Sequence, residues 1–137
     1  MTKGGTMQIA ALPWRKGKAG IEILLITSRE TKRWVIPKGW PMLHLKDFNA
    51  AKREAHEEAG VEGRVRRNPI GLYTYEKKLK DQSMRSLGVH VYGLEVVRML
   101  SHWPEYGQRL RQWQKQDAAA KLVQEPQLKF IIENFRP

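Results

Sequence analysis

The sequence predicts an α/β fold of the α+β kind, in which helices pack against a mixed β-sheet. Two observations lead to this prediction. Apolar, β-branched runs recur along most of the chain and are interrupted by one helix-like stretch, and two further helix-like stretches follow them. This order differs from the regular alternation of a doubly wound parallel sheet. Because 137 residues is the length of one ordinary domain, we expect a single domain over residues 1–137.

The first two strands are predicted to form a hairpin. Residues 8–14 are mostly apolar, and residues 21–27 are a β-branched run that is typical of a buried strand. The segment 16–20 between them is rich in glycine and lysine, which indicates a turn. A short third strand is expected over residues 34–36, and it ends at Pro37 because proline has no N–H to donate to a neighbouring strand.

A central helix is predicted over residues 47–59, after an irregular stretch. Asp47 is a suitable N-cap, because its side chain can accept a hydrogen bond from the free N–H groups of the first turn. Gly60 stands where helices commonly end in a left-handed residue. Small side chains give this helix an apolar face suited to close packing on a sheet: Ala50, Ala51, Ala55 and Ala59.

The second half of the chain is predicted to return to strands and then to end in helices. Residues 61–66, 70–75 and 87–97 have strand-like patterns, and the polar, basic segment 76–85 is expected to be an exposed loop. Two C-terminal helices are predicted within about 108–135: the first covers 108–123, and the second covers 127–135. Pro126 suits the first turn of the second helix, whose apolar residues follow helical spacing: Leu128, Ile131, Ile132 and Phe135.

The composition excludes several classes of protein. With no cysteine, the chain has no disulfide, no thiolate zinc site and no cysteine nucleophile. No apolar run approaches the ~18 residues of a membrane span, and residues 1–7 lack the apolar stretch of a signal peptide. We therefore expect a cytoplasmic protein without a membrane partner.

The charge points to an anionic partner. The chain carries 25 Lys+Arg against 14 Asp+Glu, a formal net charge of +11. Such a surface attracts polyanions, and nucleic acid, anionic lipid and phosphorylated small molecules all fit this description. A solvated basic surface without a specific partner is the alternative on charge alone.

A cluster of acidic residues lies in the predicted central helix. Glu54, Glu57 and Glu58 are spaced i, i+3 and i+4, so their carboxylates share one helix face. Like charges at this spacing repel one another unless a cation lies among them. Oxygen ligands that converge in this way suit Mg²⁺, with Mn²⁺ as the alternative. A solvated, charged helix face is the other reading of the bare pattern.

The residues around this cluster resemble the Nudix box, G-x5-E-x7-R-E-U-x-E-E-x-G-U, where U is a bulky apolar residue. The match covers residues 39–61 and departs from the box at Leu45, where the box has its first glutamate, and at Ala55, a small apolar residue. Leu45 can neither bind a cation nor accept a proton, which removes any contact that this glutamate makes. The matching residues are Gly39, Arg53, Glu54, Glu57, Glu58, Gly60 and Val61.

Other segments are similar to one branch of the Nudix hydrolases, the diphosphoinositol polyphosphate phosphohydrolases. The first comprises Ser28 and Arg29 together with the run 33–39 (RWVIPKG). The others are the short runs 71–73 (GLY), 103–105 (WPE) and 111–113 (RQW). The resemblance therefore covers most of the chain, although these segments are less specific than the box.

This resemblance implies a Nudix-type α/β/α sandwich around a mixed sheet and the hydrolysis of a diphosphate linked to another group. It implies Glu54 and Glu58 as Mg²⁺ ligands, with backbone carbonyls around Gly39 completing the metal shell. Glu57 is then the general base or a third metal ligand, and Arg53 orients Glu57. Glu76 or Glu95 could add a further metal contact, although a surface acid is the simpler reading of each.

Basic residues before and within the box fall at positions that flank the phosphate chain in the resembling branch. Arginine binds phosphate oxygens through two parallel hydrogen bonds, whereas lysine supplies a point charge. For each residue apart from Lys38, a solvated surface cation is the alternative. The predicted substrate-binding residues are Arg15, Arg29, Arg33 and Lys38, with Lys32 nearby.

The sequence thus predicts a Mg²⁺-dependent Nudix hydrolase that cleaves phosphoanhydride bonds in an anionic small molecule. Diadenosine polyphosphates and diphosphoinositol polyphosphates are the favoured substrates, because nucleoside diphosphate sugars need less positive charge. Two alternatives stay open: an RNA 5′-pyrophosphohydrolase, and a non-catalytic Nudix module that binds a nucleotide or RNA. The sequence leaves the oligomeric state open.

Overall fold

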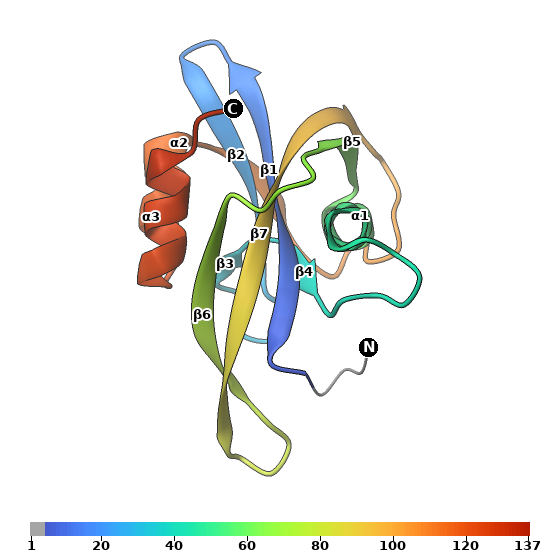
Figure 1. Cartoon of the computed structure of the whole chain (residues 1–137). Helices are drawn as coiled ribbons and strands as arrows, with labels where there is room; N and C mark the ends of the chain where they lie inside the picture. Colours follow the sequence, from blue (N-terminus) through green and yellow to red (C-terminus); the bar gives the residue numbers. More distant parts are fainter. Residues whose placement is uncertain (1–4) are drawn as a thin grey trace.

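The computed structural model of the chain describes residues 5–137, which form an eight-stranded mixed sheet with helices packed on both of its faces (Figure 1). The predicted α+β fold is therefore confirmed. In chain order the elements are β1 (Met7–Gly17), β2 (Gly20–Thr27), β3 (Trp34–Val35), β4 (Lys38–Gly39), α1 (Asp47–Glu54), η1 (Ala55–Ala59), β5 (Val61–Val65), β6 (Gly71–Lys78), β7 (Met84–Met99), β8 (Arg111–Lys115), α2 (Gln116–Leu122) and α3 (Pro126–Asn134).

Strand β1 lies at the centre of the sheet and explains its mixed character. It runs parallel to β7 from Met7 to Trp14 and antiparallel to β2 from Trp14 to Gly17. Ile9 and Ala10 pair instead with β4, so β2 and β4 follow one another along the same edge of β1. This division of the edge places Lys38 and Gly39 of β4 beside the central helix.

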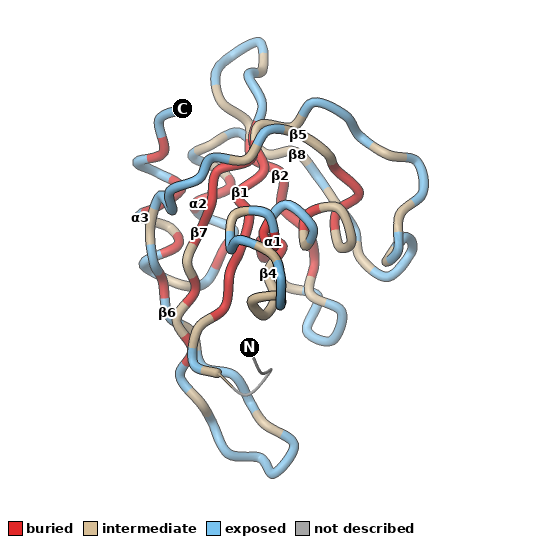
Figure 2. The backbone as a smooth tube through the Cα atoms, turned by 45° about the vertical axis from the view of Figure 1, so that its right-hand side comes forward, coloured by how far each residue is buried: buried red, intermediate tan, exposed pale blue. Residues whose placement is uncertain are grey.

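Side chains of β1 alternate between two hydrophobic cores, as the two-residue period of a strand requires. Leu12 and Trp14 belong to the core that α2 and α3 cover, whereas Ile9 and Ala11 belong to the core that α1 covers. Figure 2 shows buried residues concentrated along β1, β2 and the middle of β7. The predicted sandwich of helices on both faces of the sheet is thereby confirmed.

The central helix consists of α1 and of η1, which is one wider, π-type turn, and we call residues 47–59 the box helix. Its N-cap is Lys46, so the prediction of Asp47 as N-cap is wrong by one residue. Gly60 has a φ of 66°, a left-handed conformation that suits glycine, and it ends the helix as predicted. The four alanines of the predicted apolar face are all fully buried: Ala50, Ala51, Ala55 and Ala59.

The predicted loop over residues 76–85 is mostly a hairpin. β6 continues to Lys78 and β7 begins at Met84, so the turn covers only residues 79–83. This hairpin extends well beyond the rest of the sheet, with much of its surface exposed (Figures 1 and 2). Because both of its faces reach solvent, its side chains are polar, and this polarity conceals the strand pattern in the sequence.

The predicted helix over residues 108–123 is wrong in its first half. Residues 111–115 form β8, which pairs antiparallel with β2, and only Gln116–Leu122 is helical. Trp113 packs against the core that α1 covers, which favours an extended strand over a helix. Pairing also covers an edge of β2 that would otherwise expose unpaired backbone groups. The final helix is confirmed, with Pro126 in its first turn.

The prediction that no signal peptide is present concerns residues 1–7, of which residues 1–4 lie outside the described part of the chain. Among residues 5–137, no helix has both the length and the apolar character needed to cross a bilayer. The cytoplasmic location stays a prediction.

Candidate active site

A cavity of about 650 Å³ opens beside the box helix and is bordered by β4, by the segment that follows it and by β6. Glu54 and Glu58, which are one helical turn apart, both line this cavity. Trp40 and Tyr75 are its large aromatic residues. Its cationic lining residues are Arg29, Lys38, Lys77 and Arg109.

Glu54 lies against the backbone of β4. A Cβ atom built on Gly39 would overlap the carboxylate of Glu54, so only glycine leaves room for this carboxylate in its present position. Gly39 is itself held in place by its pairing with Ile9 of β1. The glycine that begins the box therefore brings a carboxylate into direct contact with a strand of the sheet.

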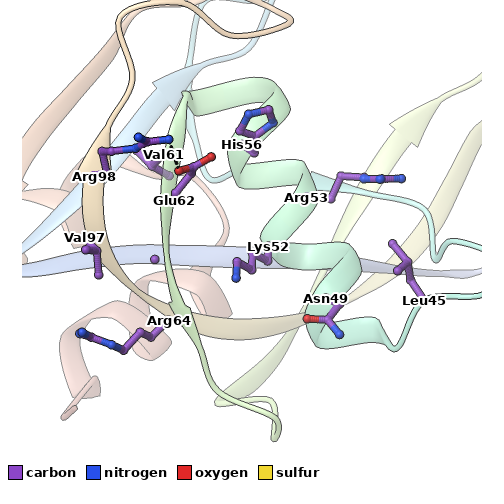
Figure 3. Close-up of a pocket in the computed structure, with 11 residues that line it drawn as sticks. Leu45, Asn49, Lys52, Arg53, His56, Val61, Glu62, Arg64, Val97 and Arg98 are labelled. Atoms are coloured by element: carbon purple, nitrogen blue, oxygen red, sulfur yellow. Dashed lines mark hydrogen bonds and ion pairs between the residues drawn. The ribbon is translucent and has the colours of Figure 1, made fainter.

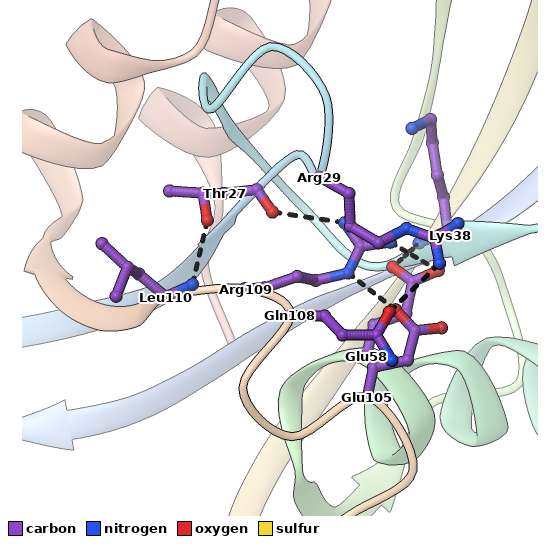
Figure 4. Close-up of polar contacts among 8 residues, drawn as sticks. All are labelled: Thr27, Arg29, Lys38, Glu58, Glu105, Gln108, Arg109 and Leu110. Atoms are coloured by element: carbon purple, nitrogen blue, oxygen red, sulfur yellow. Dashed lines mark hydrogen bonds and ion pairs between the residues drawn. The ribbon is translucent and has the colours of Figure 1, made fainter.

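Glu58 faces a backbone donor and a guanidinium from two other segments (Figure 4). The backbone N–H of Lys38 donates a hydrogen bond to Glu58 Oε1 over 3.3 Å. On the other side, Arg109 Nη2 lies 3.8 Å from Glu58 Oε2. Glu58 thus connects the box helix to β4 and to the segment that precedes β8.

The two carboxyl groups have raised pKa values because they are withdrawn from water and lie close together. Burial is the main cause for Glu54, and with the neighbouring charges of Glu58 and Glu57 it raises the pKa of Glu54 to about 8. Burial also raises the pKa of Glu58, and the positive charges of Arg109 and Lys38 oppose this change. A divalent cation between these carboxylates would relieve their repulsion, so the donor set fits Mg²⁺ or Mn²⁺.

Within residues 5–137, no group of three or more histidine, aspartate and glutamate side chains gathers closely enough to hold a metal ion. Among the described residues, the candidate metal ligands are therefore the pair Glu54 and Glu58, and the nearby Glu105 is engaged by Arg109. Mg²⁺ commonly retains several water ligands and binds substrate phosphates, so two carboxylates are a sufficient protein contribution.

The third box carboxylate is placed differently. Glu57 is not among the residues that line the cavity, although its charge contributes to the raised pKa of Glu54. Its backbone carbonyl accepts a hydrogen bond from the N–H of Glu105 over 3.0 Å. Its predicted roles as general base or third ligand stay predictions.

Arg53 and Leu45 line a different groove, of about 790 Å³, between the box helix, β5 and the end of β7 (Figure 3). In the view of Figure 3 both lie to the right of the helix, whereas Glu62 and Arg98 lie across from them. Among residues 5–137, no hydrogen bond or ion pair joins Arg53 to Glu57. The structure of these residues therefore contains no direct contact through which Arg53 could orient Glu57.

Leu45 lines this second groove and not the cavity of the carboxylate pair, so the loss of the first box glutamate removes no side chain from the cavity. We expect Leu45→Glu to change phosphate release by less than about threefold, because the new carboxylate would lie in the other groove near Arg53. Steady-state kinetics on the two proteins measure this effect, with Leu45→Gln as the uncharged control. A gain of tenfold or more in the glutamate variant alone would show that position 45 reaches the metal site.

The predicted substrate-binding residues divide into two groups. Arg29 and Lys38 line the cavity, and burial lowers the pKa of Lys38, whose Nζ lies 5.0 Å from the ring centre of Tyr75. Arg33 and Arg15 are engaged elsewhere. Their partners are Glu125, at 2.8 Å from Arg33, and Glu22, at 2.7 Å from Arg15, which also stacks on Trp113.

The remaining candidate residues lie outside the cavity. Lys32 is exposed in the turn before β3, with a positive φ of 59°. Glu76 is exposed on β6, and Glu95 lies 3.6 Å from Arg64. None of these side chains is among those that line the cavity.

The segment over residues 100–110 supplies functional candidates that the sequence analysis missed. Arg109 lines the cavity, and its Nε donates to Glu105 Oε1 over 2.8 Å. The resemblance of residues 103–105 and 111–113 to the phosphohydrolase branch pointed to this part of the chain. No sequence signal marked Arg109, because two of its partners, Thr27 and Glu58, lie far away along the chain.

Arg111 attaches this segment to the end of the box helix. Its guanidinium donates to the carbonyl groups of Ala59 and Gly60, each over 3.0 Å, and of Leu100 over 2.6 Å. It also stacks on Trp103 at 4.0 Å. These contacts fix the residues that carry Glu105 and Arg109 relative to the box carboxylates.

The raised pKa of Glu54 predicts how the stability of the metal-free protein depends on pH. Between the ordinary value of 4.5 and about 8, the folded state retains a proton that the unfolded state has lost. The free energy of unfolding should therefore fall as the pH rises through this window. Urea unfolding in the presence of a chelator measures this slope, and Glu54→Gln should reduce it.

Glu76→Gln is the control for this experiment, because it removes one exposed carboxyl group from the same chain. An equal slope in the wild type and in Glu54→Gln would contradict the assignment of the raised pKa to Glu54.

The chain is similar in sequence to known Nudix hydrolases and diphosphoinositol polyphosphate phosphohydrolases. Nudix hydrolase 12, mitochondrial, of Arabidopsis thaliana is 30% identical over 118 residues, which cover 84% of this chain and 58% of that protein. Diphosphoinositol polyphosphate phosphohydrolase 3-beta of Homo sapiens is 30% identical over 124 residues, which cover 89% of this chain and 71% of that protein. The chain thus spans less than two thirds of the first relative. No model of a known protein family matches the chain.

Solved structures share the fold. A crystal structure of an Ap4A hydrolase of C. elegans has a TM-score of 0.65 against this chain, with 20% sequence identity and 93% of each chain covered. At this level of identity the comparison bears on the fold alone, and it agrees with the helices on both faces of a mixed sheet.

Proposed function

Because the chain belongs to the Nudix hydrolase family, we propose that it is a metal-dependent hydrolase that cleaves a phosphoanhydride bond in a highly anionic substrate. Its relatives include the diphosphoinositol polyphosphate phosphohydrolases, the branch that its sequence resembles. One observation carries the proposal: two carboxylates with raised pKa values lie side by side at the wall of a cavity whose other charged residues are cations.

Glu54 and Glu58 would hold the divalent metal, which when bound supplies Lewis-acid stabilisation of charge on the phosphate oxygens. The backbone of Lys38 and Gly39 keeps both carboxylates in place, through the N–H of Lys38 and through the space left by Gly39. The protein then acts by positioning. A water molecule attacks one phosphorus, and the bridging oxygen leaves with the other phosphate.

Cations on the cavity wall would bind the phosphate chain. Arg29 can make paired hydrogen bonds to phosphate oxygens, and Arg109, whose Nε and Nη1 bond to Glu105 and Thr27, can offer Nη2. The ammonium group of Lys38 adds charge in a place that is largely withdrawn from water, where electrostatic attraction is strong. Glu57 is the proposed general base. A role of Arg53 in orienting it, which the family resemblance implies, would need a contact that residues 5–137 do not form in this structure.

The proposed substrates are diadenosine polyphosphates and diphosphoinositol polyphosphates. Relatives of this chain carry diphosphoinositol polyphosphate phosphohydrolase in their names, and a chain of the same fold is an Ap4A hydrolase. The cationic residues of the cavity outnumber its two carboxylates even before a metal adds further positive charge. Such a site favours a ligand with several phosphate groups.

A second candidate substrate is RNA with a 5′-triphosphate, and the hairpin of β6 and β7 supports it. Lys77 of this hairpin lines the cavity, and Lys78 and Lys80 lie beyond it on the exposed part. This arrangement would suit an anionic chain that continues out of the cavity. Steep salt dependence of binding, with a slope that grows with RNA length, would support this candidate.

A phosphate-release screen tests the proposal. Purified protein is assayed with dinucleoside polyphosphates, diphosphoinositol polyphosphates, nucleotide sugars and 5′-triphosphorylated RNA, with Mg²⁺ and Mn²⁺ compared. We expect metal-dependent release from one of the first two classes and loss of release with a chelator. Binding without release across the whole panel would instead favour a non-catalytic module.

A further inference from the structure

Arg109 is a nearly buried arginine at the boundary between the box carboxylates and the cavity. Its side chain is 11% exposed and belongs to the segment that leads into β8. Three groups surround its guanidinium (Figure 4). Nε donates to Glu105 Oε1 over 2.8 Å, Nη1 donates to the carbonyl oxygen of Thr27 over 3.2 Å, and Nη2 lies 3.8 Å from Glu58 Oε2.

Two of these contacts anchor the arginine, and the third does not. The distances to Glu105 and to Thr27 are those of hydrogen bonds, whereas 3.8 Å to Glu58 is too long for one. Thr27 is itself fixed by two hydrogen bonds to Leu110, the residue before Arg111. Its Oγ1 accepts from the N–H of Leu110 over 2.9 Å, and its N–H donates to the carbonyl oxygen of Leu110 over 3.0 Å. Arg109 is therefore held by other residues at a position where its charge faces Glu58.

The charge of Arg109 acts on the same carboxylate that the proposed metal would use. Glu58 has Glu54 and Glu105 as acidic neighbours, and Arg109 and Lys38 as cationic neighbours. Of these two cations, Arg109 has the larger effect on Glu58. In the metal-free protein the guanidinium thus stabilises the Glu58 carboxylate electrostatically, as a bound divalent ion would.

We propose that Arg109 is an internal counter-cation of Glu58 that competes with the divalent metal and binds the phosphate of the substrate once the metal has taken Glu58. This inference rests on the proposed function, because it assumes a metal at the two box carboxylates. Glu105 and Thr27 hold the guanidinium at the cavity wall throughout. Removing the charge of Arg109 should therefore have opposite effects on metal affinity and on turnover.

Metal affinity is measured without substrate, by titrating Mn²⁺ and following the free ion by electron paramagnetic resonance. Arg109→Met keeps much of the side-chain volume and removes the charge, and we expect it to bind Mn²⁺ about tenfold more tightly than the wild type. Arg109→Gln keeps a donor for Glu105 and should also bind more tightly. This second variant serves if the methionine variant does not fold.

Arg29→Met is the matched control, because Arg29 also lines the cavity but donates to Gln108 over 3.2 Å. Within residues 5–137, Arg29 forms no hydrogen bond or ion pair with Glu54 or Glu58. Its Mn²⁺ affinity should stay within about twofold of the wild type if only the charge beside Glu58 matters. An equal gain in Mn²⁺ affinity in Arg29→Met would show that the overall charge of the cavity controls metal binding. This result would overturn the specific role of Arg109.

Turnover supplies the second readout. At saturating Mn²⁺, Arg109→Met should lower kcat/KM by about 100-fold on the substrate that the phosphate-release screen identifies, because a phosphate contact is lost. An unchanged kcat/KM would overturn the contact with substrate. Mn²⁺ affinity equal to or weaker than that of the wild type in both neutral variants would overturn the competition.

These outcomes are distinguishable from failure of the proposed function. If the wild type binds Mn²⁺ and hydrolyses a substrate while the Arg109 variants do not bind metal more tightly, only the role of Arg109 fails. If the wild type binds no Mn²⁺ at millimolar concentration, the metal site itself fails and the inference is overturned with it.

Discussion

A Glu58→Gln variant is expected to lose about 10³-fold in phosphate release, which corresponds to about 4 kcal/mol of transition-state stabilisation. The amide keeps the shape of the side chain and can still accept a hydrogen bond from the N–H of Lys38. It removes the negative charge that the metal and Arg109 both require. Single-turnover and steady-state assays at several Mg²⁺ concentrations measure the loss.

Two further substitutions control for this result. Glu62→Gln removes a carboxylate from the other groove, where Glu62 accepts a hydrogen bond from Arg98 over 2.6 Å, and should cost less than about twofold. Glu57→Gln tests the proposed general base, and full turnover in that variant would remove Glu57 from this role. Turnover near the wild-type level in Glu58→Gln would contradict the proposed active site.

A Gly39→Ala variant is expected to fold normally and to lose about 100-fold or more in phosphate release. The new methyl group would overlap the carboxylate of Glu54, which is the end of a flexible side chain and can move aside. Stability should therefore change little, whereas the carboxylate pair separates. Thermal unfolding and phosphate release, measured on the same preparation, separate these two effects.

The chain offers a matched control for this variant. A Cβ atom on Gly17 would overlap the carboxylate of Glu22 in a comparable way, but this pair lies in the β1–β2 hairpin and not at the cavity. Gly17→Ala should thus leave turnover within about twofold of the wild type. If both glycine variants lose activity equally, the effect belongs to the backbone of the sheet and not to the Glu54 carboxylate.

The parts of the site that the sequence predicted well are those set by local spacing. Glu54 and Glu58 are four residues apart on a helix, and this spacing alone brings their side chains to one face. Gly60 was predicted correctly because the end of a helix favours a left-handed residue, which glycine adopts at low cost. The alanines of the buried face follow from the same helical period.

The parts that the sequence missed depend on partners far along the chain. Residues 111–115 have a composition that suits a helix, but pairing with β2 makes them a strand. Glu57 has the same local spacing as its neighbours, yet it does not line the cavity. Arg109 meets Thr27, which is 82 residues away in the sequence, and no local pattern contains that contact.

By itself, the sequence determined the carboxylate pair and the glycine that makes room for it, because a helical repeat and the absence of a side chain are local properties. Only the tertiary structure decided which cations face the pair and which side of the helix Leu45 occupies. The physical reason is that strand pairing joins segments distant in the chain: β4 brings Lys38 to Glu58, and β8 holds Arg109 beside it.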